Sequence, residues 1–245
     1  LGLVYVFKYI IKAIIRAILY TNYIKMNLFL EKARNLMVEN QLRPNRINDG
    51  IILDLFRNTK KEDFLRDDLK KIAYSDIDID LIENRGYLKN LHIAQLIQGS
   101  EIKKNYKILH IGGLTGYISL ILSNLCKELI VIENHEDLNL IIEEKIRDHN
   151  VNKNIKFYKS ELNKGCAEEA PYDLIFIDNP IRDIPKILFN QLNENTGKII
   201  MVKKIDQYLS QAHLITKKND NYTDSYLFDI FTNYELYKHK GEFVF

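Results

Sequence analysis

Residues 108–122, ILHIGGLTGYISLIL, decide the fold class of this chain. The apolar opening predicts a buried strand, a glycine-rich turn follows, and apolar residues then recur at helical spacing. A strand, a glycine-rich loop and a helix in this order are typical of nucleotide-binding α/β proteins. Leu114 departs from the pattern, because it stands where such a loop usually has its middle glycine.

The same alternation of segments continues over most of the chain. We expect strands at 106–111, 129–133, 155–158, 172–177 and 198–202, and helices at 26–41, 51–57, 92–98, 116–125, 137–148 and 184–192. Three further strand-like segments, 212–216, 225–231 and 242–245, have no helices between them. The alternation predicts an α/β fold with a mainly parallel sheet, helices on both faces and antiparallel C-terminal edge strands. Residues 26–245 contain no visible linker, so we expect one domain, with a helical cap over 26–100.

Composition narrows the range of partners. The 245 residues are 46% hydrophobic and carry a formal charge of +2, from 35 basic and 33 acidic side chains that are interspersed. Because no domain-wide positive field results, nucleic acid is not an expected partner. Cys126 and Cys166 are far apart and lack a metal-ligand spacing, so we expect no metal site and a reducing, cytoplasmic location.

Residues 1–25 differ from the rest of the chain. Lys8, Lys12 and Arg16 recur every four residues and would share one face of a helix, whereas isoleucines cover much of the remainder. The charge-free opening run is far shorter than the ~20 residues that span a bilayer, so stable membrane insertion is not expected. Two interpretations stay open: a basic amphipathic helix at a membrane surface, or a leader upstream of a natural start at Met26.

Candidate ligand-binding residues follow the ends of successive strands, where open α/β sheets bind ligands. Gly112 and Gly113 permit a tight turn, and Gly116 allows close packing of the helix against the strand. Glu133 ends the next strand 21 residues after Gly112, close to the ~20 residues expected for an acid that binds ribose hydroxyls. Its alternative role is that of an ordinary acid at a helix start.

Two later strand ends carry further polar residues. Ser160 and Glu161 follow the third strand and could reach an adenine ring, whereas Asp178 and Asn179 follow the fourth and would face the reaction volume. Each pair alone is an ordinary turn sequence, but their joint position favours a ligand cleft. No nucleophile stands beside a plausible base, and His110 is expected to be a packed or hydrogen-bonded residue rather than a base.

Several longer motifs occur together: MVENQLRPNRI, EDFLRDDLKKIAYSD, GGLTGY, VIE, EAPYDLIFID and IPKILFNQLNENTGKIIMV. With them, residues 26–245 resemble the protein-L-isoaspartate O-methyltransferase family, especially a divergent bacterial branch. The resemblance implies a Rossmann-like methyltransferase fold and S-adenosylmethionine as methyl donor, without a metal. It also implies methylation of the α-carboxyl of isoaspartyl residues in aged proteins.

The same resemblance implies roles for individual residues. Gly112, Gly113 and Gly116 would lie along the methionine part of the cofactor, Glu133 would bind its ribose, and Ser160 with Glu161 would border its adenine. The cofactor-binding set is completed by Leu114, Thr115 and Asp178, and the expected substrate-binding residues are Lys89, Asn90 and Asn179. No catalytic residue is assigned.

The chain also departs from the family pattern. Leu114 replaces the central glycine, and His110 replaces an acidic residue often found two places before the first glycine. YLKNL, residues 87–91, stands where the family has Thr-Ile-Ser-x-Pro, so the expected hydroxyl is absent and Lys89 could attract the acceptor carboxylate instead.

Three functions therefore stay open, all for a chain that we expect to be monomeric. The first is an isoaspartyl repair methyltransferase, or a close relative with altered protein substrates. The second is an amino-group methyltransferase, because Asn179 and Pro180 match the first half of an Asn-Pro-Pro-Tyr motif. The third is a non-catalytic member that kept the fold and lost its chemistry.

Overall fold

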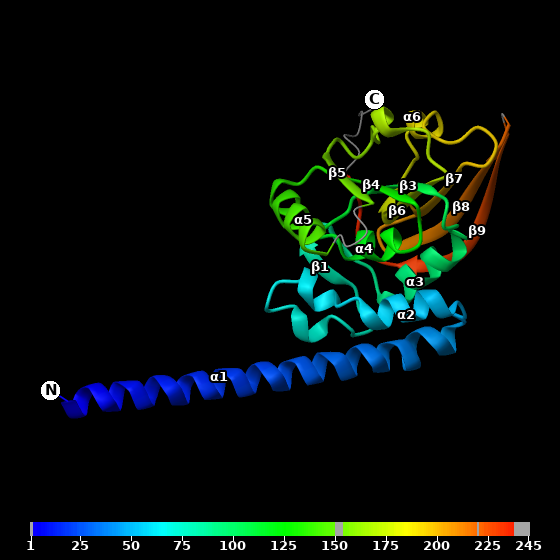
Figure 1. Ribbon diagram of the computed structural model, residues 1–245. Helices are drawn as coiled ribbons and strands as arrows, with labels where there is room; N and C mark the ends of the chain where they lie inside the picture. The colour runs from blue at the N-terminus through cyan, green and yellow to red at the C-terminus, as the bar shows by residue number, and fades with distance from the viewer. Residues whose placement is uncertain (1, 150–153, 220, 238–245) are drawn as a thin grey trace.

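The computed structural model describes residues 2–149, 154–219 and 221–237 (Figure 1). Its α-helices are α1 (Gly2–Met37), α2 (Gly50–Asn58), α3 (Asn90–Gly99), α4 (Tyr117–Ser123), α5 (Glu136–His149) and α6 (Lys186–Phe189). Its strands are β1 (Ile79–Ile82), β2 (Arg85–Tyr87), β3 (Lys107–Ile111), β4 (Glu128–Glu133), β5 (Ile155–Lys159), β6 (Leu174–Ile181), β7 (Lys198–Lys204), β8 (Leu209–Lys218) and β9 (Asn221–Phe231).

Seven strands form one sheet in the order β5-β4-β3-β6-β7-β8-β9. Strands β3 to β7 pair in parallel, and β8 and β9 continue the sheet antiparallel to β7. This confirms the predicted mainly parallel sheet with antiparallel strands at the C-terminal edge. The chain runs outward from β3 in one direction and resumes at β6 in the other, so the strand order reverses between β3 and β6. A ligand of an open α/β sheet binds at such a point.

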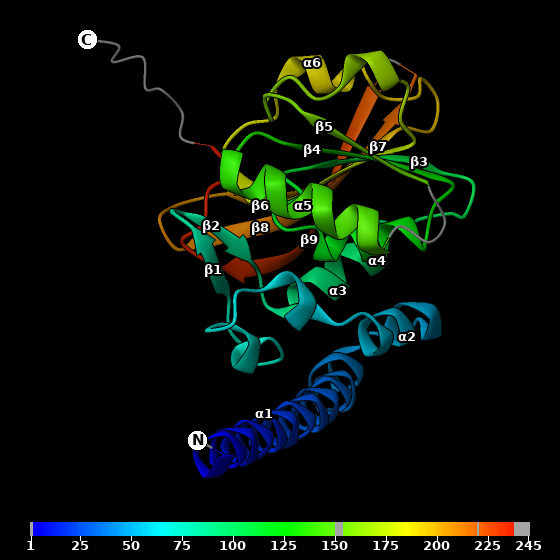
Figure 2. The same cartoon turned by 60° about the vertical axis from the view of Figure 1, so that its left-hand side comes forward.

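Two hydrophobic layers sandwich the sheet, because successive residues of each strand face opposite sides. In β4, Leu129 and Val131 join the larger cluster under α2, α3, α4 and α5, whereas Ile130 and Ile132 join the smaller one. The smaller cluster is covered by α6 and by the connection that leads from β5 to β6. Helices therefore lie on both faces, as predicted, but unequally (Figure 2).

Helix α1 is continuous from Gly2 to Met37, so no helix begins at Met26 as the sequence suggested. Apolar side chains in its first half are exposed: Ile11, Ile14, Ile15 and Ile18. Met26 packs half-buried against the core, Leu30 is fully part of it, and the helix projects past the domain (Figure 1). No helix in the described part of the chain is long and apolar enough to cross a membrane.

Several predicted boundaries were wrong. Helix α6 has only four residues instead of the nine predicted at 184–192. In the charged segment 60–80, where we expected a short helix followed by an irregular loop, two short 3-10 helices form, Lys61–Phe64 and Lys70–Ile72. Strands β8 and β9 are longer than predicted, because most of β9 is exposed and its polar residues hide the strand pattern. The predicted strand at 242–245 lies outside the described residues. The β1–β2 hairpin was missed, since three residues of β2 are too few for a periodic signal.

Candidate functional site

The glycine-rich loop turns sharply at the carboxyl end of β3. Gly112 and Gly116 have φ values of +81° and +98°, in the region that favours glycine. Leu114 also has a positive φ of +53°, but its side chain is fully buried in the larger core. The unexpected leucine therefore packs its side chain into the larger core.

Backbone carbonyls of β4 and of the loop itself accept the amide groups of three glycines. Gly112 and Gly113 both donate to the carbonyl of Ile132, at 2.9 and 3.2 Å, and Gly116 donates to Gly113 at 2.9 Å. A β-carbon at Gly113 would lie 2.5 Å from Cγ1 of Val131, so only glycine fits there. The loop is thus held close to the end of β4, which supplies the next functional group.

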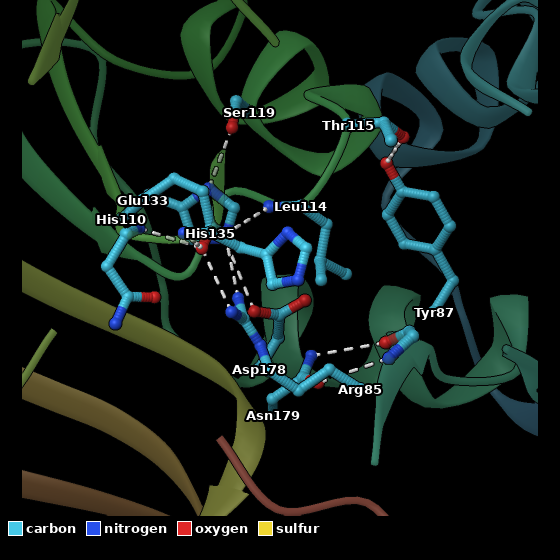
Figure 3. Close-up of polar contacts among 12 residues, drawn as sticks. Arg85, Tyr87, His110, Leu114, Thr115, Ser119, Glu133, His135, Asp178 and Asn179 are labelled. Carbon is cyan, nitrogen blue, oxygen red and sulfur yellow. Dashed lines mark hydrogen bonds and ion pairs between the residues drawn. The ribbon is translucent and has the colours of Figure 1, made fainter. Parts of the chain in front are cut away.

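Glu133 is that group, and it lies at the predicted position on the tip of β4. Its carboxylate is fully buried and forms a bidentate ion pair with Arg85, with Nη1–Oε1 at 2.9 Å and Nη2–Oε2 at 2.7 Å (Figure 3). Oε2 also accepts the amide of Leu114 at 3.1 Å. Oε1 accepts the amides of Asn134 and His135 at 2.9 and 3.1 Å.

Two opposing effects act on the acidity of Glu133. Burial raises the pKa of its carboxyl group, whereas the hydrogen bonds and charge of Arg85 and the amides of Asn134 and His135 lower it. The lowering prevails, so the pKa of Glu133 lies below its ordinary value. The group is therefore a carboxylate at neutral pH and a hydrogen-bond acceptor.

His110 and Asp178 bridge β3 and β6 at the point where the strand order reverses. Nε2 of His110 lies 3.3 Å from Oδ1 of Asp178, and Nδ1 lies 2.8 Å from Oγ of Ser119. Both ring nitrogens are engaged, which confirms the expectation of a hydrogen-bonded histidine. Oδ2 of Asp178 is buried without a hydrogen-bond partner among the described residues.

Strand β6 continues through Asp178 and Asn179 to Ile181, so these residues do not form the turn that the sequence suggested. The pairing with β7 is irregular between Ile177 and Ile181. Asn179 binds the backbone of Gly86 in β2: Oδ1 accepts from its amide at 3.4 Å and Nδ2 donates to its carbonyl at 3.2 Å (Figure 3). This side chain thus connects the hairpin to the sheet.

Thr115 makes a second connection to the hairpin. Its Oγ1 lies 2.7 Å from the hydroxyl of Tyr87 and donates to the carbonyl of Phe64 at 2.7 Å. The same tyrosine hydroxyl accepts the amide of Tyr117, the first residue of α4, at 3.1 Å. The β2 strand is therefore tied to the loop on one side and to β6 on the other.

Of the two predicted adenine-binding residues, the structure brings Ser160 into contact with Glu133 but leaves Glu161 apart from it. The amide of Ser160 donates to the backbone carbonyl of Glu133 at 3.2 Å. Glu161 is exposed, and its carboxylate pairs with Lys164 at 2.7 Å. The two residues therefore differ in environment, although they are adjacent in the sequence.

Lys89 and Asn90 begin α3. Nζ of Lys89 lies 3.8 Å from the carboxylate of Asp76, and its side chain is one-third exposed. Asn90 is buried, where it accepts a hydrogen bond from Nζ of Lys61 at 2.9 Å and donates to the carbonyl of Ala73 at 3.1 Å. Of the pair, only Lys89 has a solvent-accessible side chain.

Sequence reasoning missed Arg85 and Lys61. Arg85 comes 48 residues before its partner Glu133, and no local pattern links two such residues. One sequence signal was available, since Arg85 is the only arginine between Arg66 and Arg147 and stands beside the segment expected to meet the acceptor. Lys61 lies in a run of charged residues that is typical of a solvated surface, and its burial is a tertiary effect.

Within the described residues, no group of three or more His, Cys, Asp or Glu side chains is placed to hold a metal ion.

The family model described as "Protein-L-isoaspartate(D-aspartate) O-methyltransferase" matches residues 32–228. A protein-L-isoaspartate O-methyltransferase of Petrotoga mobilis is 28% identical over 81% of this chain and 94% of its own length. A protein-L-isoaspartate O-methyltransferase of Koribacter versatilis is 27% identical over 71% of this chain and 77% of its own length.

Solved structures agree with this assignment of the fold. A protein-L-isoaspartate O-methyltransferase superposes with a TM-score of 0.70 at 21% identity, over 84% of this chain and 65% of that one. A second structure, from Plasmodium falciparum, superposes with a TM-score of 0.69 at 21% identity, over 83% of this chain and 98% of that one. It is described as a putative enzyme of the same name in complex with S-adenosyl-L-homocysteine.

Proposed function

Because the chain belongs to the protein-L-isoaspartate O-methyltransferase family, we propose that it transfers a methyl group from S-adenosylmethionine to the α-carboxyl of isoaspartyl residues in proteins. The observation that carries this proposal is the placement of Glu133 beside the Gly112–Gly116 loop, where the strand order reverses. A carboxylate at this position accepts hydrogen bonds from ribose hydroxyls. The family match supports the same nucleoside-containing donor.

The residues of the loop and the neighbouring strand ends fit such a donor. Gly112, without a side chain, allows the methionine part to approach the backbone, and Glu133 would hold the ribose. Ser160, whose amide binds the backbone of Glu133, borders the expected adenine position. When bound, S-adenosylmethionine supplies an electrophilic methyl group, and it needs no metal for transfer. The work of the protein is to align the acceptor oxygen with that group.

Acceptor recognition is assigned to the segment between β2 and α3 and to the end of β6. Lys89 offers a partly exposed ammonium group that can attract a carboxylate. Asn90 and Asn179 complete the proposed set, acting by positioning the backbone through the hydrogen bonds that they make with Ala73 and Gly86. We propose a monomeric enzyme. Its free, buried cysteines support a reducing compartment such as the cytoplasm.

Binding calorimetry with S-adenosylhomocysteine tests the donor site. Glu133→Gln should weaken binding, because it removes the charge that accepts the ribose hydroxyls. Glu128→Gln is the matched control, since Glu128 lies at the other end of β4 and pairs with Lys156 at 2.9 Å. Equal affinity of both variants for the ligand would contradict the assignment of Glu133.

A methyl-transfer assay tests the acceptor. The protein should methylate an isoaspartyl peptide and leave the matching aspartyl peptide unmodified. Transfer to an amine-containing peptide would favour the amino-group alternative, but both amide atoms of Asn179 are engaged with Gly86 and so do not offer a free amine-binding group. Binding of the donor without transfer to any peptide would favour the non-catalytic alternative.

A further inference from the structure

The carboxylate that should hold the ribose is already fully engaged. Glu133 accepts five hydrogen bonds, two from the guanidinium of Arg85 and three from backbone amides. A carboxylate offers about four lone-pair directions. The three amides belong to the loop and to the start of the segment before α5, so they form part of the fold. Among the described residues, Arg85 is the one donor on Glu133 that a side-chain movement can remove.

Arg85 also covers the loop. The position of a β-carbon at Gly112 would lie 3.0 Å from Nη2 of Arg85 and 2.6 Å from Cδ1 of Leu236. The guanidinium therefore lies directly over the glycine where the methionine part of the donor is expected. It is 6% exposed, and Nε has no hydrogen-bond partner among the described residues.

We propose that Arg85 is a latch on the donor site: its guanidinium occupies the ribose-binding carboxylate of Glu133 and must leave before S-adenosylmethionine or S-adenosylhomocysteine binds. Arg85 thereby sets the affinity for the donor. The inference rests on the proposed function, because it takes Glu133 as the ribose-binding group.

The energetic consequence follows from competition. When only the fraction of molecules with an open site can bind, the apparent dissociation constant is the intrinsic constant divided by that fraction. A buried bidentate pair between Arg85 and Glu133 favours the closed form, since separation without new partners costs Arg85 both of these hydrogen bonds and costs Glu133 two of its five. Removing the guanidinium removes the competitor, and affinity for the donor should rise.

The test is calorimetry of S-adenosylhomocysteine with Arg85→Met in the full chain, compared with the unchanged protein. Methionine keeps much of the apolar length of the side chain and removes the charge and all donors. We expect binding at least tenfold tighter. Arg85→Lys, which keeps a point charge but loses the bidentate geometry, should fall between the two and provides a second variant if Arg85→Met does not fold.

Arg34→Met is the matched control. Arg34 forms a comparably buried ion pair with Glu62, with Nη1–Oε1 at 3.0 Å and side chains 8% and 10% exposed. It joins α1 to the segment before β1 and has no contact with Glu133 among its hydrogen bonds. Its loss should lower the melting temperature without changing the affinity for S-adenosylhomocysteine, so it separates loss of a buried pair from loss of the latch.

The outcomes distinguish this inference from the proposed function. Unchanged or weaker ligand binding by both Arg85 variants, with clear binding by the unchanged protein, would overturn the latch and leave the proposed function intact. Tighter binding by Arg85→Met without methylation of any isoaspartyl peptide would support the latch and contradict the proposed acceptor. If neither the unchanged protein nor the Arg85 variants bind the ligand, both ideas are wrong.

Discussion

Lys61 tests how the helical cap, residues 26–100, is packed, because it buries an ionisable group. Its side chain is fully buried, Nζ donates to Asn90, and it lies 5.1 and 5.5 Å from the ring centres of Tyr87 and Tyr117. Burial lowers the pKa of Lys61 from 10.5 to about 7, and the charge of Asp78 opposes this shift only in part. The protonated lysine is thus less stable in the folded chain than in the unfolded chain.

The sign of the pH effect follows from proton binding. Between the folded pKa of about 7 and the unfolded value of 10.5, the unfolded chain binds the proton more strongly, so the free energy of unfolding rises with pH. Lys61→Met removes this titration. From pH 6 to pH 9, the free energy of unfolding of the unchanged protein should rise relative to that of Lys61→Met by about 3 kcal/mol.

Urea unfolding of both proteins at the two pH values measures this difference. Lost packing of the apolar part of the side chain gives an offset that is the same at both pH values, so only the change in offset between the two pH values matters. Lys60→Met, which removes the exposed neighbouring lysine, should show no such change. Parallel pH profiles for the unchanged protein and Lys61→Met would refute the claim that Lys61 is destabilised by burial of its charge.

Three further predictions concern the loop and α1. Leu114→Gly should lower the free energy of unfolding, measured by urea unfolding, by about 2 kcal/mol. Loss of the buried side chain costs about 2–5 kcal/mol, and this outweighs the about 1–2 kcal/mol gained when the left-handed backbone is relieved of its side chain. Gly113→Ala should cost about 1–3 kcal/mol in the same assay, since its β-carbon would collide with Val131. A chain beginning at Met26 should keep its melting temperature in calorimetry, because we propose that residues 26–245 form the folding domain; a clear decrease would contradict that boundary.

The sheet could be predicted because its signal is local. Buried parallel strands are continuous apolar runs, and the strand, loop and helix around Gly112 have a recognisable order. The position of Glu133 followed from counting one helix and one strand. Family motifs then supplied the likeness to methyltransferases, which the comparisons confirmed.

The missed features are tertiary. The isolated position of Arg85 marks it in the sequence but does not indicate that a three-residue strand carries it to Glu133, and the charged run around Lys61 does not indicate burial. The fourth strand was predicted to end at residue 177, because Asp178, Asn179 and Pro180 are typical of turns, but β6 continues through them to Ile181, which pairs with Lys203 of β7. In each case long-range contacts, which the local sequence does not encode, decide the outcome.

The attachment of β2 decides how the proposed latch can open. Gly86 is held by both amide atoms of Asn179, and a β-carbon there would lie 2.2 Å from the carbonyl oxygen of Ile79. On the other side of Gly86, Tyr87 is tied to Thr115. Before Arg85, the carbonyl of Asn84 accepts the amide of Glu235 at 2.9 Å. Because the chain is held at Asn84 and again at Gly86 and Tyr87, release of Glu133 requires rotation of the Arg85 side chain and leaves the hairpin in place. Rotamer changes are fast compared with local unfolding, so the latch should limit donor affinity rather than the rate at which the donor enters.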